Sequence, residues 1–366
     1  MSFTKEDVLE ALKRVVHPES RKNVVELDMV ENLTIDGNEI RFALKFGRPN
    51  DPFIQSMKKS CVSAIEAKLG EDVKVRGNIG TIVPELRKSP EILPGVKNII
   101  AVASGKGGVG KSTVATNLAV ALHNAGYKVG LLDADVYGPS VPKMFQVEGV
   151  QPSGKSSEGT DWIIPVEKYG IKLLSVGFFV KPEDALVWRG PMATSALKQL
   201  ITQGDWGELD YLVLDMPPGT GDVHLTIVQE VPVTGAIIVS TPQEVALADV
   251  IKGISMFTGE RINVPVLGLV ENMSWFTPAE LPDNKYYIFG KDGCLKLADR
   301  MGLELLGQIP IVEGICESGD KGTPVALEVD TPLGKAFAKL AERVSAVTDL
   351  RNKNQAPTKK VEITTR

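Results

Sequence analysis

Apolar residues after position 98 gather in short continuous runs, and helical stripes separate these runs. Seven runs are typical of buried strands: 98–102, 128–132, 172–176, 211–215, 235–240, 266–270 and 305–309. The last helical stripe extends from about Pro332 to Leu350. Strands that alternate with helices predict an α/β fold with a mostly parallel sheet flanked by helices.

The first 83 residues follow a different pattern. A helical stripe over 8–16 precedes two strand-like runs, 24–33 and 39–46, with a turn at Asp36–Gly37–Asn38 between them. A second helix over 52–69 and a short strand over 73–75 complete a small α+β domain. Residues 84–97 carry three prolines and predict a linker. The second domain then covers 98–350, and the polar residues 351–366 predict a disordered tail.

Composition narrows the class of protein. A chain of 366 residues is expected to form two domains, and 43% apolar with 24% charged residues is ordinary for a globular protein. A net charge of −5 gives no support for nucleic-acid binding, and no apolar run approaches the roughly 18 residues of a membrane span. Three widely spaced cysteines do not make a disulfide framework. We therefore expect a cytoplasmic protein that binds neither nucleic acid nor membrane.

A glycine-rich segment follows the first strand of the second domain. Residues 103–113 (ASGKGGVGKST) contain G-x-x-x-x-G-K-[ST] between a strand and a helix, which predicts a P-loop rather than a chance glycine-rich turn. Backbone N–H groups and the helix N-terminus would surround phosphate, with Lys111 on the β/γ oxygens and Ser112 on Mg²⁺. The expected ATP-binding residues are Gly105, Lys106, Gly107, Gly108, Val109, Gly110, Lys111, Ser112 and Thr113.

Carboxylates stand at the ends of two further strands. Asp133 and Asp135 follow the second run, and Asp215 ends the run at 211–215 in the Walker B manner, where its carboxylate would hold Mg²⁺. The next residues, 216–222 (MPPGTGD), form a turn able to move as a switch. The plainer alternatives are a DxD turn that serves only the backbone and a buried strand that happens to end in aspartate.

Lys106 near the start of the loop resembles the deviant P-loop ATPases, the class of MinD, ParA and the nitrogenase iron protein. This resemblance implies that Lys106 contacts the partner's ATP across a dimer, and that Asp135 orients the attacking water. It implies that Asp133 supports the Mg²⁺ shell or the switch geometry. It also implies that Asn272 hydrogen-bonds the adenine, with a loop from Pro310 beside the purine. The alternatives are a solvated lysine and an asparagine that serves only a turn.

A longer set of motifs resembles the Mrp/ApbC iron–sulfur cluster carriers: DADVYGPS, RGPM, DMPPGTGD, STPQ, VENMS and GDKGTP. The first domain resembles the small domain of iron–sulfur maturation proteins, although its loop 48–52 (RPNDP) lacks the Cys-Pro pair, and Cys61 is expected in the core. The resemblance implies a homodimer that hydrolyses ATP slowly and bridges a [4Fe–4S] cluster. Its implied partners are apo iron–sulfur proteins and cluster-assembly factors.

Many members of that family carry C-x-x-C after the VENMS segment, whereas residues 275–282 here read WFTPAELP. Cys294 and Cys316 of two protomers would supply four thiolates, with the pKa of Cys294 lowered at a helix start; two unrelated thiols are the alternative.

Arg189 either contacts phosphate or a partner, or braces its turn. Two other functions share the fold: a MinD/ParA-like positioning ATPase, and a metabolic ligase or kinase. The tail after Leu350 lacks the apolar face that membrane positioning requires.

Overall fold

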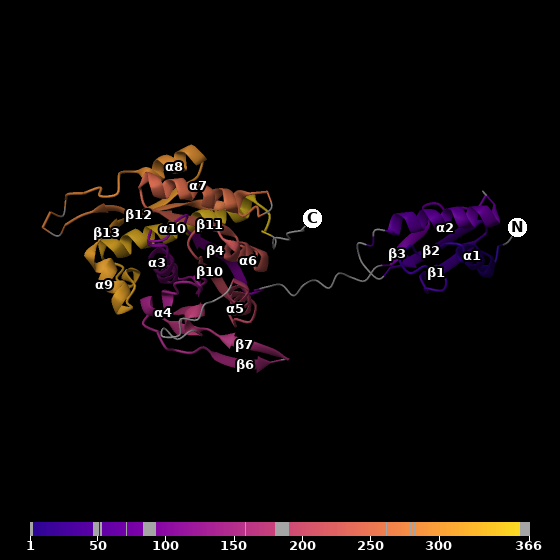
Figure 1. The fold of residues 1–366 in the computed structure, drawn as a ribbon, viewed down its shortest axis with the longest axis horizontal. Coiled ribbons are helices and arrows are strands. Elements are labelled where there is room, and N and C mark those ends of the chain that lie inside the picture. The colour runs from indigo at the N-terminus through magenta and orange to yellow at the C-terminus, as the bar shows by residue number, and fades with distance from the viewer. Residues whose placement is uncertain are drawn as a thin grey trace. The chain divides into compact units, whose positions relative to one another are not determined.

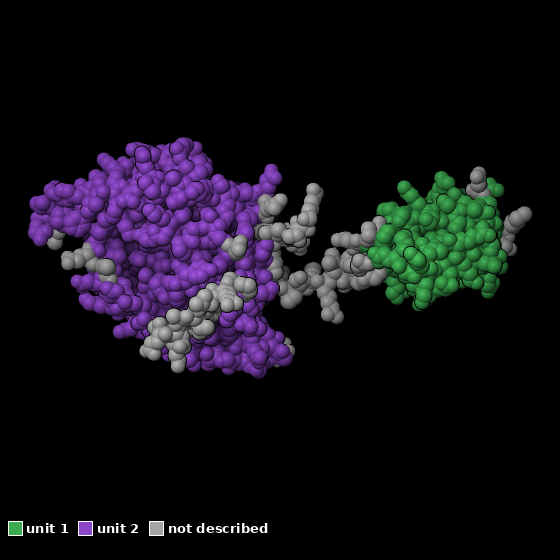
Figure 2. All heavy atoms as spheres, viewed as in Figure 1, with its two compact units in different colours: residues 1–90 green, residues 91–366 purple. Residues whose placement is uncertain are grey.

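In the computed structural model the chain divides into two compact units, Met1–Pro90 and Glu91–Arg366, which Figure 2 colours separately. The structure describes residues 3–46, 51, 53–70, 72–82, 93–157, 159–179, 190–260, 262–278, 280–281 and 283–358. Arg189, most of the predicted linker and the loop residues 48–50 and 52 therefore lie outside the described part of the chain.

The first unit is a small α+β domain, as predicted. Its elements are α1 (Lys5–Leu12), β1 (Val30–Asp36), β2 (Glu39–Lys45), α2 (Ile54–Leu69) and β3 (Ile79–Ile82). The central β2 pairs antiparallel with β1 and parallel with β3. Cys61 is fully buried in the core of this unit, which confirms its predicted place.

Two strand boundaries in this unit differ from the predictions. The first strand begins at Val30 rather than Val24, because the Asn23 side chain accepts hydrogen bonds from the backbone N–H groups of Val25 and Glu26 and holds a turn there. The apolar pair Val73 and Val75 is buried, but it flanks only an isolated bridge at Lys74. The apolar positions 73 and 75 therefore indicate burial of two side chains and not a strand paired in the sheet.

The second unit is built on an eight-stranded sheet in the order β13-β12-β11-β4-β10-β5-β9-β8, parallel except for the β8–β9 pair. Figure 1 labels the strands from β13 to β10 of this order. Its strands are β4 (Val96–Ala103), β5 (Val129–Asp133), β8 (Val166–Lys168), β9 (Ile171–Ser175), β10 (Leu209–Asp215), β11 (Gly235–Ser240), β12 (Val266–Phe276) and β13 (Leu305–Ile311). The α-helices are α3 (Lys111–Asn124), α4 (Val141–Met144), α5 (Gly190–Thr202), α6 (Asp222–Glu230), α7 (Glu244–Thr258), α8 (Gly293–Met301), α9 (Glu313–Lys321) and α10 (Pro332–Asn354).

Both faces of this sheet are buried. Side chains of β4 alternate between two cores: Ile100 and Val102 pack with α3 and α10, whereas Ile99 and Ala101 pack with α5 to α8. A strand buried on both faces reads as a continuous apolar run, which is why these strands were recognisable in the sequence. The predicted α/β fold, a mostly parallel sheet flanked by helices, is confirmed.

Some elements have no signal in the sequence. An antiparallel hairpin, β6 (Ser153–Ser157) and β7 (Thr160–Ile164), lies between α4 and β8 in the chain. Most of its residues are exposed and polar, so no hydrophobic alternation marks it. The segment after Pro310 was predicted as a loop, but it completes β13 and continues into α9.

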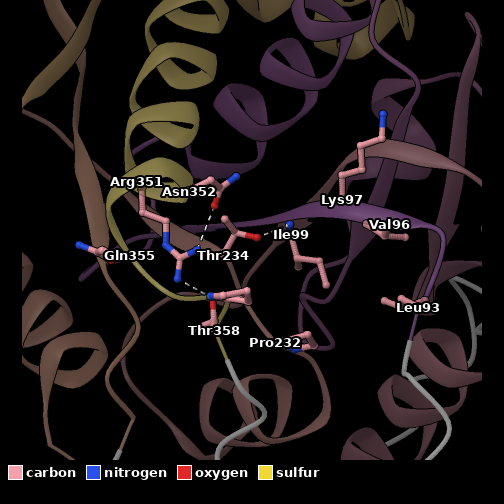
Figure 3. Close-up of a pocket in the computed structure, with 11 residues that line it drawn as sticks. Leu93, Val96, Lys97, Ile99, Pro232, Thr234, Arg351, Asn352, Gln355 and Thr358 are labelled. Atoms are coloured by element: carbon pink, nitrogen blue, oxygen red, sulfur yellow. Dashed lines mark hydrogen bonds between the residues drawn. The ribbon is translucent and has the colours of Figure 1, made fainter.

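The C-terminal helix passes its predicted end at Leu350 and ends at Asn354. From the last turn of this helix, the Arg351 guanidinium donates hydrogen bonds to the carbonyl of Ala356 at 2.9 Å and to the Thr358 hydroxyl at 3.1 Å, and Figure 3 shows the second of these. These contacts border a cavity of about 240 Å³ at the start of β4. The described chain is therefore anchored as far as residue 358, later than the predicted onset of disorder, and the last eight residues lie outside the description.

Candidate functional site

The glycine-rich loop joins the end of β4 to the start of α3, as predicted. Gly108 and Gly110 have φ angles of +81° and +80°, which favour glycine. Gly105 lies directly against α7, because a Cβ there would stand 2.7 Å from the backbone nitrogen of Val250 and overlap the backbone of Asp249. The loop thus needs glycine for two reasons, backbone conformation and close approach. Between these points Lys106 is exposed.

A buried lysine and two carboxylates meet beside this loop. Lys111 Nζ donates a hydrogen bond to Asp215 Oδ1 at 2.5 Å and lies 3.9 Å from Asp135 Oδ2. Strand pairing explains the meeting, since Asp215 of β10 lies in register with Asp133 of β5 and with Val102 of β4. Burial raises the pKa of Asp215, and the charge of Lys111 opposes that shift. The two carboxylates thus hold the lysine beside the loop.

Asp133 is committed to the backbone around it. Its Oδ1 accepts a hydrogen bond from the Asp135 N–H at 3.1 Å, and its Oδ2 accepts from the Val141 N–H at 3.2 Å and the Ser175 hydroxyl at 2.9 Å. Burial, together with the nearby Asp215 carboxylate, raises the pKa of Asp133 to about 7. These contacts favour a role in the geometry of the segment that carries Asp135 over direct contact with a metal.

The donor set fits Mg²⁺. Asp215 Oδ2 is buried and has no hydrogen-bond partner among the described residues, and the Ser112 hydroxyl lies 3.1 Å from Lys111 Nζ in the same cluster. Carboxylate and hydroxyl oxygens suit this ion, which takes its other ligands from water and phosphate. The described residues contain no group of three histidine, cysteine or acidic side chains able to hold a metal.

Asn272 lies at the loop, on the neighbouring part of the same sheet edge. Its buried side-chain amide donates a hydrogen bond to the carbonyl of Val109 at 2.9 Å. Further along β12 and β13, Trp275, Gln308 and Pro310 line a cavity of about 700 Å³. The amide thus has one partner in the loop itself, and its contact with adenine stays a prediction.

Of the two cysteines of this unit, Cys294 has a described side chain, and its thiol is free. Cys294 is fully buried, its N–H donates to Glu271 Oε2 at 2.8 Å, and its sulfur lies 3.8 Å from the Thr241 carbonyl. Burial raises the pKa of this thiol, and the Glu271 carboxylate adds to the shift, so the predicted lowering is wrong. A helix start lowers a thiol pKa only where the thiol stays hydrated. Cys316 lies in α9, and its side chain is outside the description.

One buried side chain in this region was not singled out from the sequence. His224 stands in the first turn of α6, directly after the turn that follows Asp215, and it is 1% exposed. Its Nδ1 accepts a hydrogen bond from the Gly221 N–H at 3.3 Å, within the turn that follows Asp215. No motif predicted it, because the segment 215–222 explained the switch without it.

Among the described residues, no helix combines the length and apolar character that crossing a bilayer requires.

Comparison with known proteins gives matches over both units. The model of the NUBPL iron-transfer P-loop NTPase family matches residues 95–345, and that of iron–sulfur cluster assembly proteins matches residues 5–76. An iron–sulfur cluster carrier protein of Synechocystis sp. is 42% identical over 346 residues, 94% of this chain and 97% of that protein. A mitochondrial iron–sulfur protein required for NADH dehydrogenase, from Arabidopsis thaliana, is 52% identical over 256 residues, 69% of this chain and 79% of that protein.

Among solved structures, a nucleotide-binding protein from Archaeoglobus fulgidus in complex with ADP matches with a TM-score of 0.57 and 38% identity. The match covers 67% of this chain and 94% of that chain.

Proposed function

The chain belongs to the iron–sulfur cluster carrier family of ParA-type P-loop NTPases, with an N-terminal iron–sulfur assembly domain, and on that premise we propose that it hydrolyses ATP and delivers [4Fe–4S] clusters to apo-proteins. The observation that carries the nucleotide half of the proposal is the buried cluster of Lys111, Asp135 and Asp215 beneath the glycine-rich loop.

Each residue of the cluster has a part in the proposed reaction. Lys111 would leave Asp215 for the β/γ-phosphate oxygens, where its charge has a stronger partner. Asp215 would then be free, with Ser112, to hold Mg²⁺, which supplies neutralisation of the phosphate charge. Asp135 would orient the attacking water, and its Oδ1 already accepts hydrogen bonds from the N–H groups of Tyr137 and Gly138 at 3.3 and 3.2 Å. Phosphate binding and metal binding are thereby coupled through one lysine.

A homodimer completes the site in this proposal. The exposed side chain of Lys106 would contact the ATP of the other protomer, while its backbone carbonyl accepts a hydrogen bond from the Ser104 hydroxyl at 3.0 Å within the loop. Asn272 would contact the adenine, either while its amide keeps the hydrogen bond to the Val109 carbonyl or after that bond breaks. Hydrolysis would loosen the 216–222 turn and change the dimer interface that holds the cluster.

Substitution at Asp135 tests the nucleotide half. Asp135→Ala is expected to bind ATP with an affinity close to that of the wild type and to lose hydrolysis by about 100-fold or more, because only the water loses its partner. Calorimetry and phosphate release measure the two quantities. Asp299→Ala, an exposed acid on α8, is the matched control. Unchanged hydrolysis in the Asp135 variant would remove the role proposed for this residue.

The cluster is cargo, and the cysteines that hold it form the second half of the proposal. Because Cys294 is a core thiol, one Cys316 from each protomer would supply two thiolates, half of the usual complement. Other ligands would come from outside these residues, and a cytoplasmic, reducing location would keep the thiols available. Apo iron–sulfur proteins and cluster-assembly factors are the proposed partners.

Anaerobic reconstitution with iron and sulfide tests this half. We expect Cys294→Ala to retain as much iron per dimer as the wild type, and Cys316→Ala to lose it, with Cys61→Ala of the first unit as control. Transfer is then measured by activation of an apo [4Fe–4S] enzyme. Full iron content in Cys316→Ala would exclude this ligand, and absence of iron from the wild type would contradict cargo binding.

A further inference from the structure

A groove of about 660 Å³ lies between α7 and α8. The two helices pack into the same core on one face of the sheet and lie side by side in Figure 1. They touch where they begin, because a Cβ on Gly293 would stand 2.8 Å from the carbonyl carbon of Pro242. Lining residues extend over 244–251 on α7 and over 293–300 on α8, so the groove is about 10 Å long, or two helical turns.

The floor of the groove is apolar. Leu247 and Ile251 of α7 pack on the core beneath them and are only half-buried, and the exposed Ala248 lies between them. Leu297 of α8 and the half-buried Phe289 complete this surface. On α7 the lining positions 244, 247, 248 and 251 follow the spacing i, i+3, i+4 and i+7, which places them on one side of the helix.

The rim of the groove is basic. Lys291, Lys296 and Arg300 line it, against the single acid Glu244. None of the three cations forms an ion pair with an acid in the described part of the chain, although Lys291 lies over the ring of Tyr287 at 5.0 Å. Lys296 and Arg300 are exposed at i and i+4 of α8, where like charges destabilise a helix. In a chain with a net charge of −5, this rim is suited to an acidic ligand.

We propose that the groove between α7 and α8 is a docking site for an acidic amphipathic helix of a partner protein. Apolar side chains of that helix at i, i+3, i+4 and i+7 would cover the floor, and its glutamates or aspartates would pair with the cations of α8. A nucleic acid would pair with the cations but leave the apolar floor uncovered. Docking of this kind requires neither ATP hydrolysis nor a cluster.

Binding of a fluorescent peptide to the full chain, followed by anisotropy, tests the proposal. The peptide has about 18 residues, enough to form a helix, with leucine at i, i+3, i+4 and i+7 and glutamate on both flanks. We expect micromolar affinity that falls as salt rises. Lys296→Glu/Arg300→Glu should weaken binding by about tenfold or more, because two attractive charges become repulsive, whereas Lys296→Arg should not. Ala248→Glu should also weaken it, because a carboxylate then occupies the floor.

Lys335→Glu/Lys339→Glu is the matched control. It makes the same change of charge at two exposed lysines, i and i+4 on α10, which packs into the other core, and it should leave binding unchanged. Circular dichroism shows whether each variant is folded.

Equal weakening by this control, or equal binding of a peptide with the same residues in scrambled order, would overturn the proposal. So would the absence of peptide binding below about 100 µM. A DNA duplex that displaces the peptide, or self-association that Lys296→Glu/Arg300→Glu abolishes, would assign the groove to nucleic acid or to a second copy of this chain instead.

Discussion

Three glycines of one loop should respond to alanine in three different ways. At Gly107 an added Cβ meets nothing closer than a side-chain carbon of Pro218 at 3.9 Å. At Gly108 the space is open, but φ is +81°. At Gly105 the Cβ would stand 2.7 Å from the Val250 backbone nitrogen and overlap the neighbouring carbonyl, so the loop or α7 must move. The same substitution therefore tests an uncrowded position at Gly107, a left-handed backbone at Gly108 and a steric clash with α7 at Gly105.

These differences give an order of stability for the nucleotide-free protein. Gly107→Ala should change the free energy of unfolding by less than about 0.5 kcal/mol, as surface substitutions usually do. Gly108→Ala should cost about 1–2 kcal/mol, the penalty of a left-handed conformation for a residue with a Cβ. Gly105→Ala should cost about 3 kcal/mol or more, because the atoms it meets are backbone and cannot rotate away.

Urea unfolding followed by tryptophan fluorescence measures this order without interference from the first unit. All four tryptophans, Trp162, Trp188, Trp206 and Trp275, belong to the second unit, so the signal reports that unit alone. Where the variants have the same m-value, their unfolding midpoints give the differences in the free energy of unfolding. Equal midpoints for Gly105→Ala and Gly107→Ala would show that the loop does not pack against α7 as described.

Other predictions follow from the same cluster and cores. Lys111→Ala should abolish nucleotide binding in calorimetry and cost about 3 kcal/mol in urea unfolding, since the buried Asp215 carboxylate loses its cation; retained binding would contradict the site. In Cys316→Ser protein, Cys61 and Cys294 should react with a thiol reagent at pH 8 only after unfolding, because both are buried and burial raises their thiol pKa; rapid native reaction would contradict this. Because the folded pKa of Asp133, about 7, exceeds its ordinary value of 3.8, the folded state binds the extra proton between these values. The free energy of unfolding should therefore fall as pH rises from 4 to 7, by at most about 1.4 kcal/mol per unit, relative to Asp133→Asn; parallel profiles would contradict it.

The nucleotide loop and the acids were predictable because each is a local feature. A buried strand, a glycine-rich turn and a helix start occupy consecutive residues, and the parallel sheet brings Asp133 and Asp215 into register at one edge. Strands buried on both faces left long apolar runs, so their order along the chain could be read. Those predictions needed no knowledge of contacts between distant residues.

The predictions that were wrong or missing concern features that depend on contacts between distant residues. The pKa of Cys294 follows from burial against Glu271, 23 residues away, which its position at a helix start does not reveal. The anchoring of the chain beyond Leu350 depends on the side chains of Arg351 and Asn352, and the Asn352 amide donates a hydrogen bond to Asn98, 254 residues away. His224 became visible only through its burial beside the turn that follows Asp215. The local sequence predicted the course of the backbone, whereas contacts between distant residues determine the pKa values and the hydrogen bonds of these side chains.

Hydrolysis by mixed dimers tests the central claim most directly. Lys106→Ala and Lys111→Ala proteins should each be inactive alone. If Lys106 acts on the partner's ATP, a heterodimer of the two variants contains one site with both lysines intact. An equimolar mixture, after exchange of protomers, should then recover about one quarter of wild-type ATP hydrolysis, since half of the dimers are mixed and each has one working site. No recovery from a mixture shown to contain heterodimers would contradict the composite site.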